Sequence, residues 1–423
     1  MKYIKRITDE KLKQYLNIFG AVLVEGPKWC GKTSSSKQYA ASVFEIADPK
    51  NNFQNRTIAQ IDPEQVLNGD FPRLIDEWQE VPPLWDAVRY RADENSSRGQ
   101  YILTGSSTPN DLLKIHSGAG RIGRLRMSTM TLKELGVSKA KISLNDLLYG
   151  NIEIKHNLAG ELTLDTLVDQ ICKGGWAGLI DFGVEDSLEV LRNYVRTLTD
   201  EDLSKIDGVR RDPAKLMALL QSMSRNTATL VSKETIRKDI EQYNSLELYT
   251  ATVGEYINLL VRVFVVNEIP AWDPAIKSTV RLRTAPKRIL VDPSIAVAAL
   301  KATPKALKQD LKLVGNLFET LVLRDLLVYA GANNADIYHY NDNANLEIDA
   351  IVEGKDKEWG AIEVELGYTK EDEAAANLLR LVDKIEETKQ KPPRFLAVIT
   401  GIGSILKRRD DGVLVIPIDM LGE

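Results

Sequence analysis

The first third of the chain alternates short apolar runs with stretches of helical pattern. Five such runs follow one another between residues 19 and 130, namely AVLVEG, VFEIAD, RLIDEW, YILTGSS and RIGRLRM. Short strands separated by helices are typical of a parallel sheet with crossover helices. We therefore predict an α/β domain with a parallel sheet over residues 1–140.

The pattern changes after this sheet. Residues 141–192 are mixed and contain the turn-like sequence GGWAG, which predicts a helical connector. Residues 193–300 have a helical pattern followed by a β-rich stretch, the outline of a winged-helix domain. Residues 301–423 give a helix, strands, a second helix and a further strand, which predicts a second α/β domain.

Composition narrows the choice of partners and compartment. The 423 residues hold 55 Lys and Arg against 60 Asp and Glu, so no overall positive field favours nucleic acid, and any basic surface is local. Two cysteines, Cys30 and Cys172, are too few for a disulfide framework, and the three histidines show no metal-ligand spacing. The first residues lack the apolar core of a signal peptide, and residues 256–269 are too short to span a bilayer. We expect a cytoplasmic protein with no membrane partner.

The strongest motif is GPKWCGKT at residues 26–33, which follows the strand AVLVE directly and matches G-x-x-x-x-G-K-[ST]. Its backbone N–H groups and the following helix N-terminus would hold phosphates, Lys32 would reach the β- and γ-phosphates, and Thr33 would bind Mg²⁺. We predict ATP and Mg²⁺ as cofactors. The expected nucleotide-binding residues are Gly26, Pro27, Lys28, Trp29, Cys30, Gly31, Lys32, Thr33, Ser34 and Ser106.

Two carboxylates end the apolar strand RLIDE. Asp76 would hold Mg²⁺ through water, and Glu77 would orient the attacking water, which makes Glu77 and Lys32 catalytic candidates. Without the upstream motif, an Asp-Glu pair at a strand end is usually a solvated turn. The phosphate loop favours the catalytic interpretation and predicts hydrolysis in addition to binding.

Two further segments follow the carboxylates. Ser106, in YILTGSS, would lie beside the γ-phosphate, although such a cluster is also typical of a helix cap. Arg121, Arg124 and Arg126 follow, and we choose Arg121 as an arginine finger donated to a neighbouring subunit, which predicts a homo-oligomer. The alternative is that these arginines form surface ion pairs.

Together these motifs resemble prokaryotic ATPases of the AAA+ superfamily that carry a C-terminal domain of unassigned role. The resemblance is carried by GPKWCGKT, RLIDEWQEVPPLWDAVR, YILTGSS, HSGAGRIGRLRM, GGWAG and the tail GNLFETLV, EIDAIV and AIEVELG. It implies an AAA+-like core, a winged-helix middle and a C-terminal α/β fold similar to the PD-(D/E)xK restriction-endonuclease-like nucleases. It implies no particular substrate, because a fold does not fix function.

Double-stranded DNA is a candidate partner of the middle. The helix beginning near Thr252 would read bases but supplies Thr252, Glu255 and Asn258, with no Lys or Arg before Arg262. Basic residues around it would hold backbone phosphates or form a solvated face. These are Lys233, Arg237, Lys238, Lys277, Arg281, Arg283, Lys287 and Arg288.

The tail matches the acids of the nuclease pattern but not its lysine. Glu319, Asp349 and Glu363 would gather around Mg²⁺ in such a site. Glu365 stands where the lysine is expected, and a carboxylate there repels a DNA phosphate. We therefore predict a degenerate site without cleavage; the alternative is a set of exposed acids on an edge strand.

The main functional hypothesis is a Mg²⁺-dependent ATPase that couples ATP binding and hydrolysis to movement of its C-terminal modules, with DNA as one candidate partner. One alternative is a nucleotide-gated DNA-binding regulator without significant turnover. Another is a metal-dependent nuclease with an ATPase motor. Glu77 favours turnover over a pure switch, and Glu365 speaks against the nuclease.

Overall fold

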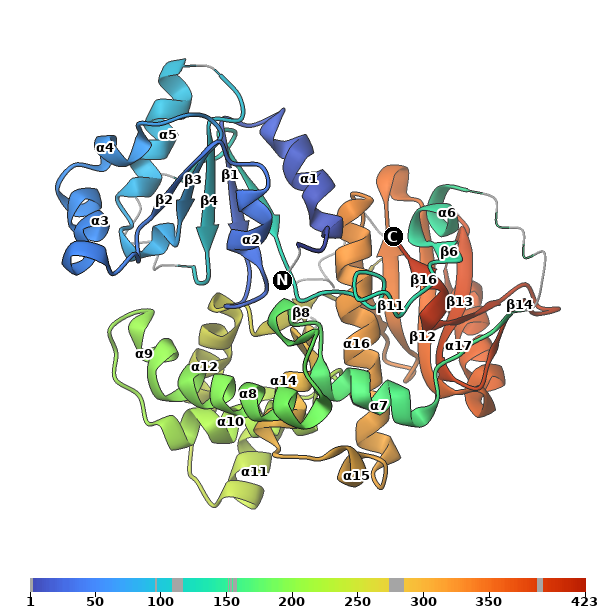
Figure 1. Cartoon of the computed structure of the whole chain (residues 1–423). Coiled ribbons are helices and arrows are strands. Elements are labelled where there is room, and N and C mark those ends of the chain that lie inside the picture. The colour runs from blue at the N-terminus through green and yellow to red at the C-terminus, as the bar shows by residue number, and fades with distance from the viewer. Residues whose placement is uncertain are drawn as a thin grey trace.

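The N-terminal part is built on a sheet of five parallel strands in the order β2–β3–β4–β1–β5 (Figure 1). The five apolar runs of the sequence are these strands, so the predicted parallel sheet is confirmed. Their bounds are β1 Ala21–Glu25, β2 Ser42–Glu45, β3 Arg73–Asp76, β4 Tyr101–Gly105 and β5 Ile122–Arg126. Because all five are parallel, their carboxyl ends meet at one edge, where a P-loop site is expected.

Helices cover both faces of this sheet. Leu23 packs with Ile75 and Leu103 in one core, while Val22 and Val24 face the opposite core with Leu12 of the first helix. Burial on both faces explains why the strands are continuous apolar runs. The helices are α1 Ile7–Leu16, α2 Lys32–Lys37, α3 Lys50–Ile61, α4 Pro63–Leu67, α5 Leu84–Asn95 and the 3₁₀ turn η1 Trp78–Glu80.

The middle is helical and ends in an antiparallel hairpin. Three helices, α10 Pro213–Arg225, α11 Lys233–Asn244 and α12 Thr250–Arg262, precede strands β8 Val266–Ile269 and β9 Lys287–Leu290. An isolated bridge joins Thr229 to Arg288 of the hairpin. This order has the outline of a winged helix, and that assignment stays a prediction. The other elements are α7 Leu164–Lys173, η3 Ala177–Leu179, α8 Val184–Thr197, the π-helical turn η4 Leu198–Asp202, α9 Leu203–Lys205 and α14 Pro293–Ala299.

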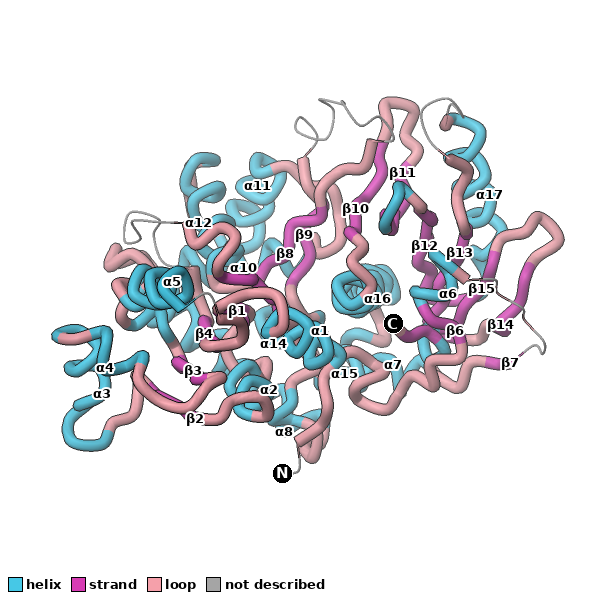
Figure 2. Tube along the Cα trace, turned by 90° about the horizontal axis from the view of Figure 1, so that it is seen from above, coloured by secondary structure: helices cyan, strands magenta, loops and turns pink. Residues whose placement is uncertain are grey.

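A seven-stranded mixed sheet forms the C-terminal part, in the order β10–β11–β12–β13–β15–β14–β7. The long helix α16 packs on it and also contacts α1, so it stands between the N-terminal and C-terminal parts (Figure 1). The β8–β9 hairpin lies beside β10 (Figure 2). The bounds are α15 Pro304–Leu307, α16 Leu311–Ala332, β10 Asp336–Asn341, β11 Glu347–Glu353, η5 Lys355–Lys357, β12 Trp359–Gly367, η6 Tyr368–Lys370, α17 Glu371–Lys384, β13 Phe395–Ile402, β14 Ile405–Arg408, β15 Leu414–Pro417, η7 Ile418–Met420 and β16 Leu421–Gly422.

The first half of the predicted connector is attached to the C-terminal part. Strand β6, Ile142–Ser143, pairs with β16, and β7, Leu158–Ala159, pairs with β14. Helix α6, Leu144–Tyr149, lies between them in the chain. These two-residue strands carry no periodic signal, so the sequence pattern missed them; the domain boundaries stay a prediction.

A buried ion-pair cluster joins all three parts. Arg324 of α16 pairs with Asp292 at 3.0 Å and with Asp325 at 2.7 Å, and each of these side chains is at most 1% exposed. Asp292 also accepts hydrogen bonds from the Thr129 hydroxyl at 2.8 Å and from the Gly175 N–H at 2.9 Å. Asp325 accepts from the backbone N–H of Leu132 at 2.9 Å. One buried ion-pair cluster thus joins three segments of the chain. These are the segment that follows β5, the GGWAG segment and helix α16.

The glycines of GGWAG are explained by close approaches around this cluster. A Cβ at Gly175 would lie 2.0 Å from the Met130 carbonyl oxygen, and one at Gly174, where φ is +66°, would lie 2.2 Å from Asp292. A Cβ at Gly178 would lie 2.5 Å from the Trp29 ring. Such distances exclude any larger residue without a shift of the neighbouring segment.

The described residues are 3–95, 97–108, 117–150, 152, 154, 158–273, 285–385 and 391–423 of this computed structural model. Within these ranges no helix is both long enough and apolar enough to cross a bilayer. His116, His156, Lys277, Arg281 and Arg283 lie outside the described residues.

The ion-pair cluster makes a prediction about stability. Arg324→Met removes the cation and leaves two buried carboxylates uncompensated, so we expect a loss of about 3–5 kcal/mol in the free energy of unfolding. Arg196→Met is the matched control, because Arg196 is 77% exposed in its pair with Asp200 and its loss should stay within about 0.5 kcal/mol. Urea denaturation of both variants measures the difference; equal, small losses would contradict the role of the cluster.

Candidate nucleotide site at the phosphate loop

The loop between β1 and α2 has a backbone that only particular residues allow. Gly31, the N-cap of α2, has φ of +105°, and Trp29 has φ of +70°. A Cβ at Gly26 would lie 2.1 Å from the carbonyl oxygen of Met127. The two motif glycines are therefore required by the turn and by its contact with the segment after β5.

Lys32 is buried and folds back across its own loop. Its Nζ donates to the carbonyl oxygens of Gly26 at 3.0 Å and Pro27 at 2.8 Å. The loop is supported from behind by Arg6, whose guanidinium donates to the carbonyl of Cys30 at 2.9 Å and pairs with Glu134 at 3.0 Å. Sequence reasoning missed Arg6, which has no motif around it.

The structure brings Thr33 and Asp76 together. The Asp76 Oδ1 accepts from the Thr33 hydroxyl at 2.7 Å and from the Thr104 hydroxyl at 2.6 Å. A hydroxyl and a carboxylate at this place fit Mg²⁺, which takes few protein ligands and completes its shell with water and phosphate. Among the described residues no group of three His, Cys, Asp or Glu could hold a metal ion by itself.

Glu77 begins the turn after β3 in a left-handed conformation, with φ of 58° and ψ of 49°. A non-glycine residue held in this region is strained, and such strain gathers at functional sites. Its backbone N–H donates to the Thr104 hydroxyl at 3.0 Å, and its carboxylate accepts from the Ser106 hydroxyl at 2.9 Å and from the Gln79 amide. Ser106 is therefore hydrogen-bonded to the Glu77 carboxylate. Gln79 is a second polar partner of Glu77, and the sequence pattern did not single it out.

The three arginines after residue 120 have different surroundings. Arg121 precedes β5, at the amino-end edge of the sheet, and pairs with Asp93 at 2.6 Å. It is thus at the edge opposite its own phosphate loop, and its role as a finger in a neighbouring subunit stays a prediction. Arg126 donates to Asn267 of the β8–β9 hairpin at 2.7 Å, and Arg124 lies 3.7 Å from Glu25.

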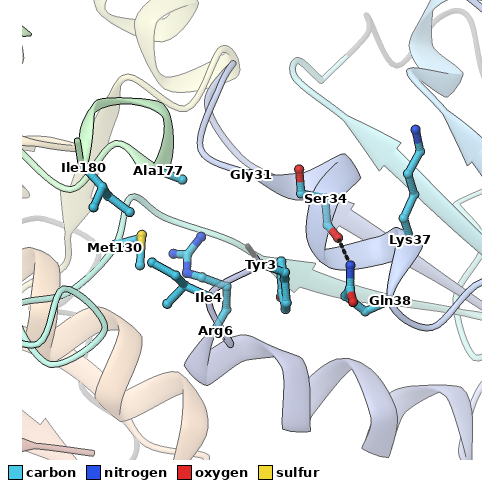
Figure 3. A pocket seen from close by; sticks show the side chains of 10 residues that line it. All are labelled: Tyr3, Ile4, Arg6, Gly31, Ser34, Lys37, Gln38, Met130, Ala177 and Ile180. Carbon is cyan, nitrogen blue, oxygen red and sulfur yellow. Dashed lines mark hydrogen bonds between the residues drawn. The ribbon is translucent and has the colours of Figure 1, made fainter. Parts of the chain in front are cut away.

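Two cavities flank the loop. One, of 310 Å³, is bounded by the N-terminal segment, α2 and the GGWAG region (Figure 3). The amide of Gln38 donates to the Ser34 carbonyl at 3.2 Å on its α2 side (Figure 3). Its lining is Tyr3, Ile4, Arg6, Gly31, Ser34, Lys37, Gln38, Met130, Ala177 and Ile180. The other, of 480 Å³, lies against the middle helices and includes Lys28, Gln79 and Ser106.

The predicted acids of the C-terminal part also come together, but around a lysine. Lys287 of β9 is fully buried, and its Nζ lies 2.7 Å from Glu319, 3.0 Å from Asp349 and 3.2 Å from Glu347. Glu363 is 7% exposed, and its carboxylate accepts a hydrogen bond from the backbone N–H of Asp349 at 3.4 Å. Strand β12 is central in its sheet, so the alternative of exposed acids on an edge strand is wrong.

Burial and the lysine set the charge of this cluster. Burial lowers the pKa of Lys287, but the carboxylates of Asp349 and Glu319 outweigh it and raise that pKa well above its usual value. Burial raises the pKa of Asp349, but Lys287 outweighs it and the net shift is downward. Burial and Asp349 raise the pKa of both Glu319 and Glu363. The ammonium of Lys287 is therefore the cation among these acids.

Three of the five basic DNA-binding candidates that the structure describes are engaged in ion pairs within the chain. Lys287 is buried, so the expectation that it holds a DNA phosphate is wrong. Arg288 pairs with Glu268 at 2.9 Å, and Arg237 pairs with Glu234 and Glu241 at 3.0 Å each. Lys233 and Lys238 are exposed on α11.

Glu365 is half-buried and lines a cavity of 960 Å³ together with Glu319, Lys312 and Lys370. Burial raises its pKa to about 7, although Lys370 acts in the opposite direction. Folded chains therefore hold this proton more tightly than unfolded chains do. The stability that this gives is present below pH 4.5 and is lost as the pH rises through 7.

This shift predicts a pH dependence that one substitution removes. Glu365→Gln should flatten the fall in the urea midpoint between about pH 4.5 and pH 7, because the variant has no proton to lose there. Glu189→Gln, at a side chain 69% exposed, is the control and should keep the wild-type profile. Identical slopes in Glu365→Gln and the wild type would contradict the assignment.

Three protein-family models match the chain in succession. Residues 19–136 match the family described as AAA domain, residues 164–306 a domain of unknown function (DUF8612) and residues 314–421 another domain of unknown function (DUF4143). The first match covers the parallel sheet and the phosphate loop described above. Residues 19–136 are therefore similar to an AAA domain and contain the P-loop sequence.

Comparison with individual proteins shows how much of the chain is similar to each of them. Uncharacterized proteins of Mycobacterium bovis and Mycobacterium tuberculosis are each 25% identical over 360 residues, which covers 84% of this chain and 73% of theirs. The Walker-type ATPase of Pyrococcus abyssi is 13% identical with a TM-score of 0.43, covering 70% of this chain and 96% of that one.

Proposed function

We propose that this protein is a Mg²⁺-dependent ATPase that hydrolyses ATP at the loop between β1 and α2, and that nucleotide state moves the middle and C-terminal parts. One observation carries the proposal: the carboxyl edge of the parallel sheet gathers Thr33, Asp76 and Glu77, each hydrogen-bonded to a hydroxyl or carboxylate of the same site. Phosphoryl transfer to water needs this combination of an anion-binding loop, a metal-holding carboxylate and a carboxylate for water.

Each residue then has one task. The Lys32 ammonium would turn from the loop carbonyls to the phosphates. Thr33 and Asp76 would hold the metal, which would neutralise phosphate charge when bound. Glu77 accepts a hydrogen bond from the attacking water and orients it. Ser106 and Gln79 fix the Glu77 carboxylate, so the water is held at a defined place.

The cavity of 310 Å³ offers a binding site for the adenine base of ATP. It adjoins Gly31 and Ser34, the start of the helix after the loop, and Ile4, Met130 and Ile180 enter it from other segments (Figure 3). An apolar slot beside a phosphate loop suits a flat heterocycle, and the amide of Gln38 lies at its wall. The phosphates would then extend along the loop toward Asp76.

Two other parts of the proposal concern partners. Arg121 would act on the phosphates of a neighbouring copy, because its own loop is at the other edge of the sheet, so the protein would work as a homo-oligomer. Double-stranded DNA stays a candidate partner through Lys233 and Lys238 of α11. DNA cleavage is not part of the proposal, since Lys287 fills the acid cluster and Glu365 faces the cavity beside it.

Glu77→Gln tests the proposal most simply. The variant keeps the shape of the side chain but loses the charge that polarises water, so kcat for ATP should fall by about 10²- to 10⁴-fold while nucleotide affinity stays within about threefold. The measurement is steady-state phosphate release with Mg²⁺, with and without double-stranded DNA, alongside nucleotide titration.

Two further variants accompany Glu77→Gln, one that tests nucleotide binding and one that serves as a control. Lys32→Ala should lose nucleotide affinity, because it removes the cation that meets the phosphates. Glu64→Gln is the matched control: Glu64 of α4 is 46% exposed, is paired with Arg91 and lines neither cavity beside the loop, so its substitution should leave turnover unchanged. Wild-type turnover in Glu77→Gln would contradict the proposed role of that carboxylate.

A further inference from the structure

The tip of the phosphate loop is packed against the middle part. The Trp29 ring stacks on Trp176 of GGWAG, with centroids 6.0 Å apart and planes inclined by 24°, and Trp176 contacts Tyr194 of α8 at 5.2 Å. Gly178 leaves room for the Trp29 ring, because a Cβ there would lie 2.5 Å from it. Trp29, in the middle of the motif, thus contacts the GGWAG segment of the middle part rather than solvent alone.

Lys28 has a specific ionic partner in the middle part. Its Nζ lies 2.6 Å from the Oδ1 of Asp202, whose side chain is only 12% exposed, while that of Lys28 is 52% exposed. Asp202 is the last residue of η4, a π-helical turn between α8 and α9. Such turns are rare and often occur at functional sites.

The pair stands at the cavity where the reacting end of a nucleotide would lie. Lys28 and Asp202 line the 480 Å³ cavity together with Gln79 and Ser106, the two residues hydrogen-bonded to Glu77. An anion that enters this cavity meets a cation already engaged by a carboxylate.

We infer that Asp202 is a positioning residue that acts through Lys28 and makes the site respond to the γ-phosphate. Without nucleotide, Asp202 holds the Lys28 ammonium against η4. A triphosphate has to take the ammonium over from that carboxylate, and the competition weakens triphosphate binding. This inference rests on the proposed function. It adds that a residue outside the P-loop domain, Asp202 of η4, makes the protein bind a nucleoside triphosphate and a diphosphate differently.

Coupling of this kind works in both directions. If Asp202 weakens triphosphate binding by a given factor, triphosphate weakens the Lys28–Asp202 pair by the same factor. Since η4 packs against α8, α9 and α10, the loss of this contact frees the helices that lead into α11 and α12. Nucleotide state at the loop would thereby reach the middle part through this ion pair.

The test compares affinities for a non-hydrolysable ATP analogue and for ADP, both with Mg²⁺, in the wild type and in Asp202→Asn. Removing the charge of Asp202 should tighten the analogue by about three- to tenfold and leave ADP within twofold, so the ratio of the two affinities changes. Asp200→Asn, in the same turn and paired with the exposed Arg196, is the matched control and should leave the ratio unchanged.

A double-substitution cycle separates this role from a structural one. Lys28→Met, at a half-exposed side chain, should reduce the preference for the analogue, and adding Asp202→Asn to it should have no further effect. An unchanged ratio in Asp202→Asn, or an Asp202→Asn effect that persists in the Lys28→Met background, would overturn the inference. If the Asp202 variant does not fold, Lys28→Met decides alone, and an unchanged ratio there overturns it too.

The proposed function is tested by a different arm of the same experiment. Wild-type protein that binds neither the analogue nor ADP contradicts the nucleotide site itself. Wild-type protein that binds both, with variants that do not differ, contradicts only the role of Asp202.

Discussion

The structure depends on one buried arginine. Arg324 lies in the centre of α16 with Asp292 on one side and Asp325 on the other, all three withdrawn from water, and these carboxylates also bind Thr129, Leu132 and Gly175. Charges at such depth are tolerated only when they are paired and hydrogen-bonded. The chain therefore has to bring the exit of its parallel sheet, its GGWAG turn and its longest helix to one point, and the relative placement of the three parts follows from that requirement.

That placement puts the GGWAG region beside the phosphate loop. Gly175 has to be a glycine to pass the Met130 carbonyl, and three residues later Gly178 admits the Trp29 ring of the loop. The cavity suited to a base is lined by Gly31 of the loop and Ala177 of the middle part, and the other cavity is lined by Lys28 of the loop and Asp202 of the middle part. A nucleotide bound at the loop would therefore touch the middle part at both of its ends, which is what coupling of binding to movement requires.

The sequence predicted those parts of the site that depend on residues close together in the chain. The five strands follow from apolar runs, and Lys32, Thr33, Asp76 and Glu77 follow from a loop motif and from a strand end. Contacts between distant segments have no such signature: Arg6 reaches the loop and Glu134, and Lys287 enters an acid cluster from the β8–β9 hairpin. The strand period of two marks Glu365 as a departure from the nuclease pattern. Only the fold shows that Lys287, from the β8–β9 hairpin, lies among the acids.

The central claim is that the loop between β1 and α2 is where the phosphates of ATP and its metal bind. A crystal structure of the protein with Mg²⁺ and a non-hydrolysable ATP analogue tests it most directly. We expect phosphates inside the loop, with the Lys32 ammonium moved from the Gly26 and Pro27 carbonyls to phosphate oxygens. The Thr33 hydroxyl should have moved from Asp76 to the metal. Analogue bound at another place, with these three hydrogen bonds intact, would contradict it.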